Sequence, residues 1–328
     1  MREIEGFDGI LFIGDVHASS KAPGRRIDNY AAAVLDKLVQ CAAICHEQRL
    51  YPVCLGDLFH RARENSLELL AGMMAVLRTF PAPMLVLGGS HDRTESWFTS
   101  KDAAKLLADA GVIELIDEPG LVKALRINGE RVAIWGTPAG YPVPDSVTTN
   151  PEGTNLMVTH HDFDFNGLYP GAEELHEIEH CSLLVNGHMH TPCNMVLRGG
   201  TACHNPGSLL RVSVDLRKMT PAVSVWTPAH GLSLQRVPLK VAEDVFDLTG
   251  KEVYAADPRT LKAALPKGLR LSSFAAKLRA TEELEAGRTD DGSVLVEELE
   301  AYLTRFDKPD NLKRYLTGLL AEVVAERT

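Results

Sequence analysis

Five short segments of the chain combine histidine with aspartate or glycine, and each lies at the end of an apolar run. They are GDVH at 14–17, GDLFH at 56–60, GGSHD at 88–92, VTHHD at 158–162 and NGHMH at 186–190. Imidazole and carboxylate groups without thiolates suit borderline metal ions such as manganese, iron or zinc. One such segment alone is more often a hydrogen-bonded loop, but five in order predict a shared metal site.

Apolar runs predict the elements that position these segments. We expect strands at 10–13, 51–55, 84–87, 131–135, 156–158 and 183–185, and helices at about 29–48 and 66–78. This order indicates an α/β fold, in which the loops that follow parallel strands lie at one edge of a sheet. Alternating residues around Ala229, His230 and Gly231 predict a closing antiparallel hairpin.

The spacing within the segments indicates two ions. Asp15 with His17, and His188 with His190, are i, i+2 pairs that point the same way only on extended backbone. Two ions about 3.5–4 Å apart that share a carboxylate can bind both the attacking and the leaving oxygen of an in-line displacement. Asp57 is our candidate for that carboxylate. We therefore expect hydrolysis of phosphate esters with two divalent cations, of which we favour manganese over iron or zinc.

The ordered set D-x-H, G-D, G-x-H-D, H and G-H-x-H, between residues 10 and 208, resembles the signature of calcineurin-like metallophosphoesterases. The resemblance implies a sandwich of two mixed sheets flanked by helices. It also implies roles for the residues at the matching positions. These are Asp15, His17 and His190 on one metal, His160 and His188 on the other, Asp57 between the two, and His91 as the acid near the leaving oxygen.

At one position of this set two histidines could be the ligand, and at another the residue differs from that of the family. We choose His160 over His161 as the ligand because His160 directly follows the apolar strand, and we expect His161 and Arg93 to contact substrate. Ser90 stands where the family has asparagine, whose amide oxygen binds the second metal. A hydroxyl is a shorter and poorer neutral ligand, which leaves three readings: an enzyme with a weakened second site, an altered metal preference, or a degenerate scaffold.

The segment GDLFH resembles the SbcD-type nuclease subunits of double-strand-break repair, including phage versions. His60 matches their additional site histidine, which contacts the phosphate of DNA, and residues 205–208 resemble their P-G-S turn. The resemblance implies DNA as substrate and a coiled-coil ATPase of the SbcC type as partner.

The chain divides into two parts by pattern. Residues 1–239 carry the strands and all candidate site residues, and we predict a phosphoesterase domain there. Residues 240–328 carry two amphipathic helical stripes, near 295–306 and 312–323. This helical region is either an appendage packed on the main domain or a surface that docks a partner, including a second copy in a homodimer.

Composition narrows the classes further. The chain has 328 residues, of which 45% are hydrophobic and 24% charged, so it can bury a sizeable core. Six scattered cysteines without C-x-x-C spacing indicate buried thiols rather than disulfides. Without a long apolar run or a signal peptide, we expect a cytoplasmic protein that does not bind membranes.

Three functions compete at this point. The first is a manganese-dependent DNA nuclease subunit that works with an ATPase in repair or recombination. The second is a stand-alone phosphodiesterase or phosphomonoesterase for small esters or nucleotides, which the net charge of −10 favours. The third, which rests on Ser90, is a metal-binding scaffold of low activity.

Overall fold

A computed structural model describes residues 3–150, 153–165 and 172–248. The chain forms a large unit, Met1–Ala22, Ile27–Val212 and Leu216–Phe246, and a second unit of residues 23–26, 213–215 and 247–328. In the second unit the backbone N–H of Asp247 donates to the carbonyl of Arg25 at 2.9 Å. The helical stripes predicted at 295–306 and 312–323 lie outside the described residues, so the domain boundary at 239 stays a prediction.

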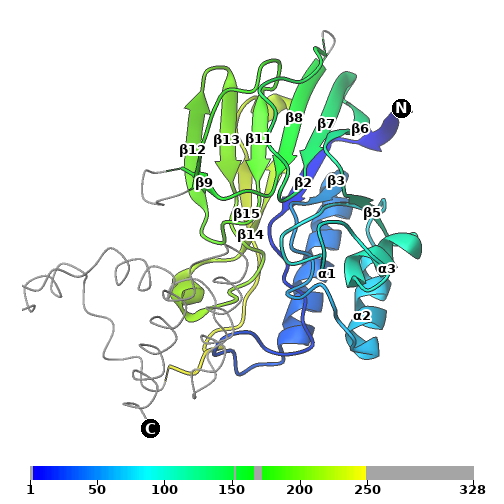
Figure 1. Ribbon diagram of the computed structural model, residues 1–328, viewed down its shortest axis with the longest axis vertical. Coiled ribbons are helices and arrows are strands. Elements are labelled where there is room, and N and C mark those ends of the chain that lie inside the picture. Colours follow the sequence, from blue (N-terminus) through cyan, green and yellow to red (C-terminus); the bar gives the residue numbers. More distant parts are fainter. Residues whose placement is uncertain (1–2, 151–152, 166–171, 249–328) are drawn as a thin grey trace, which may run out of the picture. The chain divides into compact units, whose positions relative to one another are not determined.

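The first sheet of the large unit has six strands in the order β15-β14-β2-β3-β4-β5 (Figure 1). Their bounds are β2 Gly9–Ile13, β3 Leu50–Cys54, β4 Met84–Leu87, β5 Ile113–Ile116, β14 Ala222–Trp226 and β15 Gln235–Pro238. Strands β2 to β5 run parallel, and β14 and β15 form the predicted antiparallel hairpin. The parallel strands β2, β3 and β4 are buried along their whole length, which explains their unbroken apolar sequences.

The second sheet has seven strands in the order β1-β6-β7-β8-β11-β13-β12. Their bounds are β1 Ile4–Phe7, β6 Gly120–Ile127, β7 Glu130–Thr137, β8 Gly153–Thr159, β11 Leu183–Asn186, β12 Cys193–Arg198 and β13 Thr201–Asn205. Strands β7, β8, β11 and β13 are parallel. A short parallel pair, β9 Phe163–Asp164 and β10 Glu173–Glu174, and two 3₁₀ helices, Val214–Lys218 and Pro228–His230, complete the described elements.

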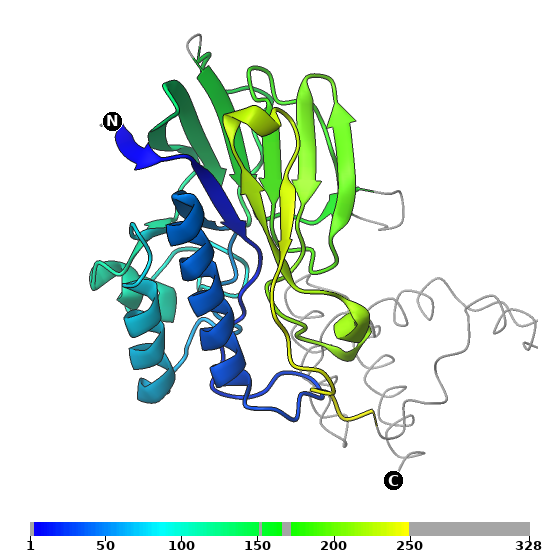
Figure 2. The same ribbon diagram turned by 180° about the vertical axis from the view of Figure 1, so that it is seen from behind.

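The two sheets pack face to face, as the family resemblance implied. One hydrophobic cluster joins Ile10 and Phe12 of β2 to Leu156 and Val158 of β8, and it includes Trp226 of β14. In Figure 2, seen from behind, the yellow strands β14 and β15 lie across the green strands of the seven-stranded sheet. The molecule is thus the expected two-sheet sandwich.

Three helices cover the outer face of the six-stranded sheet. Helix α1 (Tyr30–Gln48) begins at Asn29, whose side chain accepts the N–H of Ala32, and α2 (Leu67–Leu77) begins at Ser66 in the same way. Helix α3 is Ala103–Asp109. The apolar faces of all three helices and of β2, β3 and β4 form one core cluster. In the described part of the chain no helix is long and apolar enough to cross a membrane.

The loops that carry the five sequence segments come from both sheets. Three of the segments follow β2, β3 and β4, and the other two follow β8 and β11. The expectation of a single sheet edge, drawn from parallel strands alone, is therefore wrong. The sandwich brings together the carboxyl ends of strands from two sheets, so that residues of the loops from both sheets lie close together.

A turn at 206–208 closes this arrangement. Ser208 N–H donates to the carbonyl of His190 at 2.9 Å and Leu209 N–H donates to that of Asp15 at 3.0 Å. Gly207 has φ of 81°, and its carbonyl lies where a methyl group on Gly14 would be. The turn therefore fixes two loops of the site through backbone contacts that only glycine at position 14 permits.

We predict that Gly14→Ala destabilises the protein by about 1–3 kcal/mol, because the added methyl group must displace the Gly207 backbone. Urea unfolding followed by circular dichroism measures the change. Gly200→Ala is the matched control, since its methyl group meets only the carboxylate end of Glu177. Equal stability of Gly14→Ala and wild type would contradict the packing described for this turn.

Candidate metal centre

The five loops bring histidines and aspartates into three overlapping groups. Within each group the ligand atoms lie within 4.8 Å of one another. The groups are Asp15, His17 and His190; Asp57, His160 and His188; and His17, His60 and His91. The first two contain every predicted metal ligand other than Ser90, and no cysteine of the described residues joins any group.

Backbone strain marks three of these residues. His17, Asp57 and His188 have φ of 48°, 48° and 71°, in the left-handed region that residues with a side chain rarely adopt. Such strain persists only where surrounding contacts hold it, and it gathers at functional sites. Here the three residues lie in the loops that follow β2, β3 and β11.

Asp57 occupies the centre of the cluster. Its Oδ1 accepts the backbone N–H of His91 at 2.8 Å. Its Oδ2 lies 3.7 Å from His17 Nε2, in the first group, and 3.3 Å from His160 Nε2, in the second. One carboxylate oxygen thus faces ligand atoms of both groups, which is the position that a bridging carboxylate requires.

Asp15 joins the loops after β2 and β11. Its Oδ1 accepts the backbone N–H of His188 at 2.8 Å, while its buried Oδ2 has no hydrogen-bond partner among the described residues. His17 Nε2 and His190 Nε2 lie only 2.8 Å apart. Two lone pairs cannot face each other at that distance, so a proton or a metal ion must lie between or beside them.

The hydrogen bonds of His160 define which of its nitrogens can bind a metal. Its Nδ1 donates to the carbonyl of Leu55 at 2.8 Å, which leaves a lone pair on Nε2. That Nε2 is buried and has no hydrogen-bond partner among the described residues. Because this Nε2 lies 3.3 Å from Asp57 Oδ2, it must hold either a proton or a metal ion.

The electrostatics of the site attract positive charge. Burial lowers the pKa of His160, but the negative charges of Asp57 and then Asp15 outweigh it and raise that pKa to about 9. Burial raises the pKa of Asp57, yet His160 and then His17 hold it well below its usual range. Burial and the neighbouring His160 lower the pKa of His188, which favours the neutral imidazole that binds metals.

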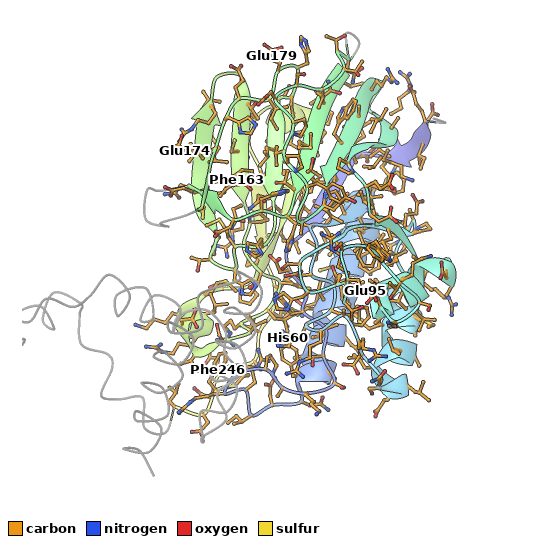
Figure 3. All side chains as sticks on the ribbon, in the orientation of Figure 1. His60, Glu95, Phe163, Glu174, Glu179 and Phe246 are labelled. Carbon is orange, nitrogen blue, oxygen red and sulfur yellow. The ribbon has the colours of Figure 1, made fainter. Side chains whose placement is uncertain are left out.

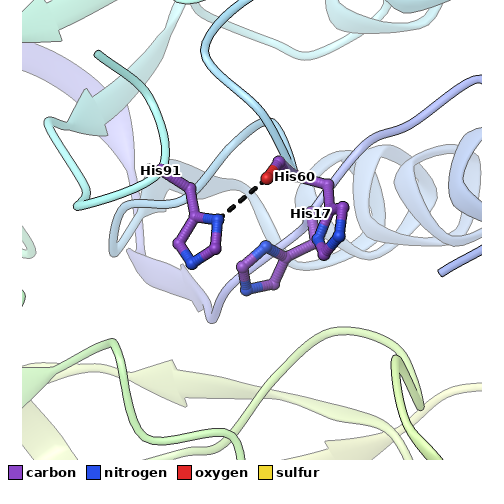
Figure 4. Close-up of side chains that lie close together, drawn as sticks. All are labelled: His17, His60 and His91. Carbon is purple, nitrogen blue, oxygen red and sulfur yellow. Dashed lines mark hydrogen bonds between the residues drawn. The ribbon is translucent and has the colours of Figure 1, made fainter. Parts of the chain in front are cut away.

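His60 and His91 lie beside the two groups rather than within them. His91 Nδ1 donates to the backbone carbonyl of His60 at 2.8 Å, the bond drawn in Figure 4. The imidazole rings of His17 and His91 are 5.0 Å apart, edge to face, and those of His60 and His91 are 5.7 Å apart, stacked. The bond to His60 fixes the ring of His91 and leaves its Nε2 available for proton transfer.

The remaining predicted site residues differ in their placement. Ser90 is exposed, and its hydroxyl lies 3.5 Å from Asp57 Oδ2. Arg93 is half-buried, and its guanidinium donates to the carbonyls of Ser96 and Ala139. His161 is buried, and its Nε2 donates to the carbonyl of Tyr141 at 2.7 Å. His161 belongs to none of the three groups, so its contact with substrate stays a prediction.

Two buried polar residues that the sequence left without a role position the loops. The Asp92 carboxylate accepts N–H groups of Leu58, Phe59 and Gly89, and so ties two loops together. Burial, and then the charge of Asp57, raise the pKa of Asp92 to about 6. Asn186 accepts the N–H of His161 and donates to its carbonyl. Asp92 is the last residue of the GGSHD segment, and this position was the feature of the sequence that could have indicated its role.

The sequence profile of the calcineurin-like phosphoesterase family matches residues 9–192, more than half of the chain and all five loops. The chain belongs to this family. Membership implies a metal-dependent phosphoester hydrolase that binds two divalent ions, and the two Asp/His groups supply donors of the required kind. No curated protein sequence matches the chain significantly.

A search of solved structures found chains that are distantly similar to this phosphoesterase. A 5′-nucleotidase precursor from Thermus thermophilus is 13% identical, with 78% of this chain and 59% of that chain covered and a TM-score of 0.38. A hypothetical protein from the same organism is 10% identical, with 71% and 100% covered and a TM-score of 0.39. A predicted phosphoesterase from Streptococcus pneumoniae is 14% identical, with 71% and 98% covered and a TM-score of 0.27. Likenesses this distant carry no inference about substrate.

We predict that Ser90→Asn lowers the manganese concentration needed for half-maximal activity of this phosphoesterase. An amide oxygen reaches further than the Ser90 hydroxyl and is a better neutral donor, so the second site fills at lower concentration. Metal titration by calorimetry and by activity measures the effect. Ser100→Asn, at an exposed position outside the three groups, is the control. Identical curves for Ser90→Asn and wild type would exclude position 90 from the metal's surroundings.

Proposed function

We propose that this protein is a two-metal phosphodiesterase that cleaves nucleic acid. The observation that carries the two-metal chemistry is that Asp57 Oδ2 lies 3.7 Å from His17 Nε2 and 3.3 Å from His160 Nε2. Two divalent ions held by these groups would supply Lewis-acid chemistry to a phosphate ester and strengthen water as a nucleophile. The donors are imidazoles and carboxylates without thiolate, which suit manganese, iron or zinc, and among these we favour manganese.

The chain's own residues supply orientation and a proton. His91 makes two hydrogen bonds to the loop after β3. Its backbone N–H donates to the Asp57 carboxylate, and its Nδ1 donates to the carbonyl of His60. A protonated His91 therefore holds its second proton at Nε2 and can donate it to the leaving oxygen. His60, whose ring stacks near that of His91, is placed to orient a phosphate beside it.

The nuclease assignment rests on the likeness of GDLFH and His60 to SbcD-type subunits. A coiled-coil ATPase of the SbcC type as partner, or a second copy of the chain, belongs to this proposal. The segment expected to dock such a partner lies outside the described residues. A stand-alone enzyme for small phosphate esters is the alternative, which the net charge of −10 favours.

The proposal is tested by manganese-dependent digestion of linear and circular DNA alongside bis(4-nitrophenyl) phosphate. Cleavage of DNA and of the small diester supports a nuclease, and cleavage of the small diester alone supports the stand-alone enzyme. If the metal-loaded protein cleaves neither substrate, the remaining hypothesis is the metal-binding scaffold of low activity that Ser90 suggested. Nuclease contamination is detected by Asp57→Asn, which should lose all activity.

Asp57→Asn should lose bound manganese together with activity, because the amide removes the negative charge that both groups of ligands face. We expect metal content, measured by mass spectrometry after desalting, to fall from two ions towards one or none per chain. Asp109→Asn, at an exposed carboxylate paired with Lys105, is the control and should keep both ions. Full metal content in Asp57→Asn would disprove the bridging position.

His91→Ala should keep its metal but turn over more slowly. Loss of a general acid near the leaving oxygen typically reduces the rate by about 10²- to 10⁴-fold. The deficit should be smaller for a diester with a nitrophenol leaving group than for DNA, because nitrophenolate needs less protonation. His46→Ala, an exposed histidine of helix α1, is the control. Equal deficits on both substrates would argue against proton donation to the leaving group.

A further inference from the structure

An open cavity of about 460 Å³ lies next to the metal groups. It begins at Ser90 and His91, the residues that contact Asp57, and continues to Arg61, Arg63, Arg93 and Thr94. No aspartate or glutamate lines it. A pocket lined by three arginines and by no acidic residue is unexpected on a chain of net charge −10, and these residue types suit a phosphate group.

The loop that carries Arg61 and Arg63 is fixed by its backbone. Ala62 between them is buried, and its carbonyl accepts the N–H of Ala103 at 2.7 Å. The side chains of Arg61 and Arg63 are exposed and make no ion pair or hydrogen bond with the described residues. The adjacent carboxylate of Glu64 forms no ion pair with either arginine, and it accepts hydrogen bonds from Ser20 and Ser66.

Arg93 is held in place by uncharged groups. Its guanidinium donates to the backbone carbonyl of Ser96 at 3.1 Å and to that of Ala139. These two bonds use two of five N–H donors and none of the positive charge. Arg93 is therefore oriented in advance and keeps donors for an anion.

The same loop presents an exposed aromatic ring. The carboxylate of Asp102 accepts both the N–H and the hydroxyl of Thr94 and of Thr99, which pins the loop at its two ends. Between these anchors Phe98 is buried, while Trp97 is 64% exposed. The carboxylate of Glu95, in the same loop, forms an ion pair with Lys101 at 3.2 Å. Figure 3 labels Glu95 and also His60 at the metal site. The loop is thus anchored at Thr94 and Thr99 and presents an exposed indole, a group on which a base can stack.

We propose that Arg61, Arg63 and Arg93 bind the phosphate next to the scissile one, and that Trp97 stacks on a base of the same single strand. This inference rests on the proposed phosphodiesterase function and gives it a substrate class. Phosphate in a basic groove with bases on aromatic rings is the general mode of single-strand binding. A duplex, whose bases are already stacked, offers its phosphates but not a free base face.

The decisive measurement compares two substrates that differ in the features the subsite recognises. Bis(4-nitrophenyl) phosphate has one phosphate and no base, whereas an oligothymidylate has flanking phosphates and bases. For the double variant Arg61→Ala/Arg63→Ala, we expect the ratio of kcat/KM for oligothymidylate to that for the small diester to fall about 10-fold or more. The dependence of log kcat/KM on log salt should also become shallower by about 0.7 per lost phosphate contact. Arg78→Ala, an exposed arginine outside the pocket, should change neither.

The stacking step has its own variants. Trp97→Ala should lower oligothymidylate affinity about 5- to 100-fold, whereas Trp97→Phe, which keeps an aromatic face, should retain most of it. A duplex of the same length should be less sensitive to Trp97→Ala. The inference is overturned if Arg61→Ala/Arg63→Ala lowers kcat/KM equally for oligothymidylate and the small diester, or lowers neither. It is also overturned if Trp97→Ala weakens duplex binding as much as single-strand binding.

Binding can be read without turnover. The chain has three tryptophans, and Trp226 is buried while Trp135 is half-buried and donates to Asn155. We expect an oligothymidylate with phosphorothioate linkages to quench the fluorescence of the manganese-loaded wild type but not of Trp97→Phe. Quenching that survives in Trp97→Phe would place the base elsewhere. If wild type binds the oligonucleotide but cleaves neither substrate, the proposed function fails while the subsite stands.

Discussion

The buried carboxylate of Asp57 is the feature on which the rest of the site depends. An unpaired charge in a protein interior costs several kcal/mol, so Asp57 at 1% exposure requires positive partners. His160 and His17 supply them on either side, and protons or divalent ions provide the charge. Since metal ions bind this arrangement only when the five loops have folded, their binding free energy also stabilises the fold.

Holding that carboxylate in place requires rigidity in the loops around it. Each loop follows a buried strand, and buried carboxylates that accept backbone N–H groups join the loops. Asp92 connects the loops after β3 and β4, and Asp15 connects those after β2 and β11. These contacts overdetermine the backbone and so maintain positive φ at His17 and Asp57. Ligands on the ends of packed strands keep their geometry better than ligands on free loops.

The sequence predicted the parts of this structure that local pattern controls. Strand β4 was expected at its observed bounds, and the spacing of apolar residues gave α1 and α2 to within about a residue. Pattern could not reveal that the site spans two sheets, because strand pairing depends on contacts between distant segments. The roles of Asp92 and Asn186 were missed for the same reason, since each acts through backbone groups that lie far away in the sequence.

The net charge of −10 does not by itself decide which phosphate ester the protein cleaves. A sum over the sequence does not say where charges lie, whereas a phosphate responds to the local field at the cleft. Asp15 and Asp57 contribute two negative charges to the metal groups, and two divalent ions there would reverse that local sign. Arg61 and Arg63 extend the positive region away from the metal site through one loop. An acidic protein can thus present a local cationic path for a phosphate chain, and its acidic remainder disfavours binding of nucleic acid elsewhere on the surface.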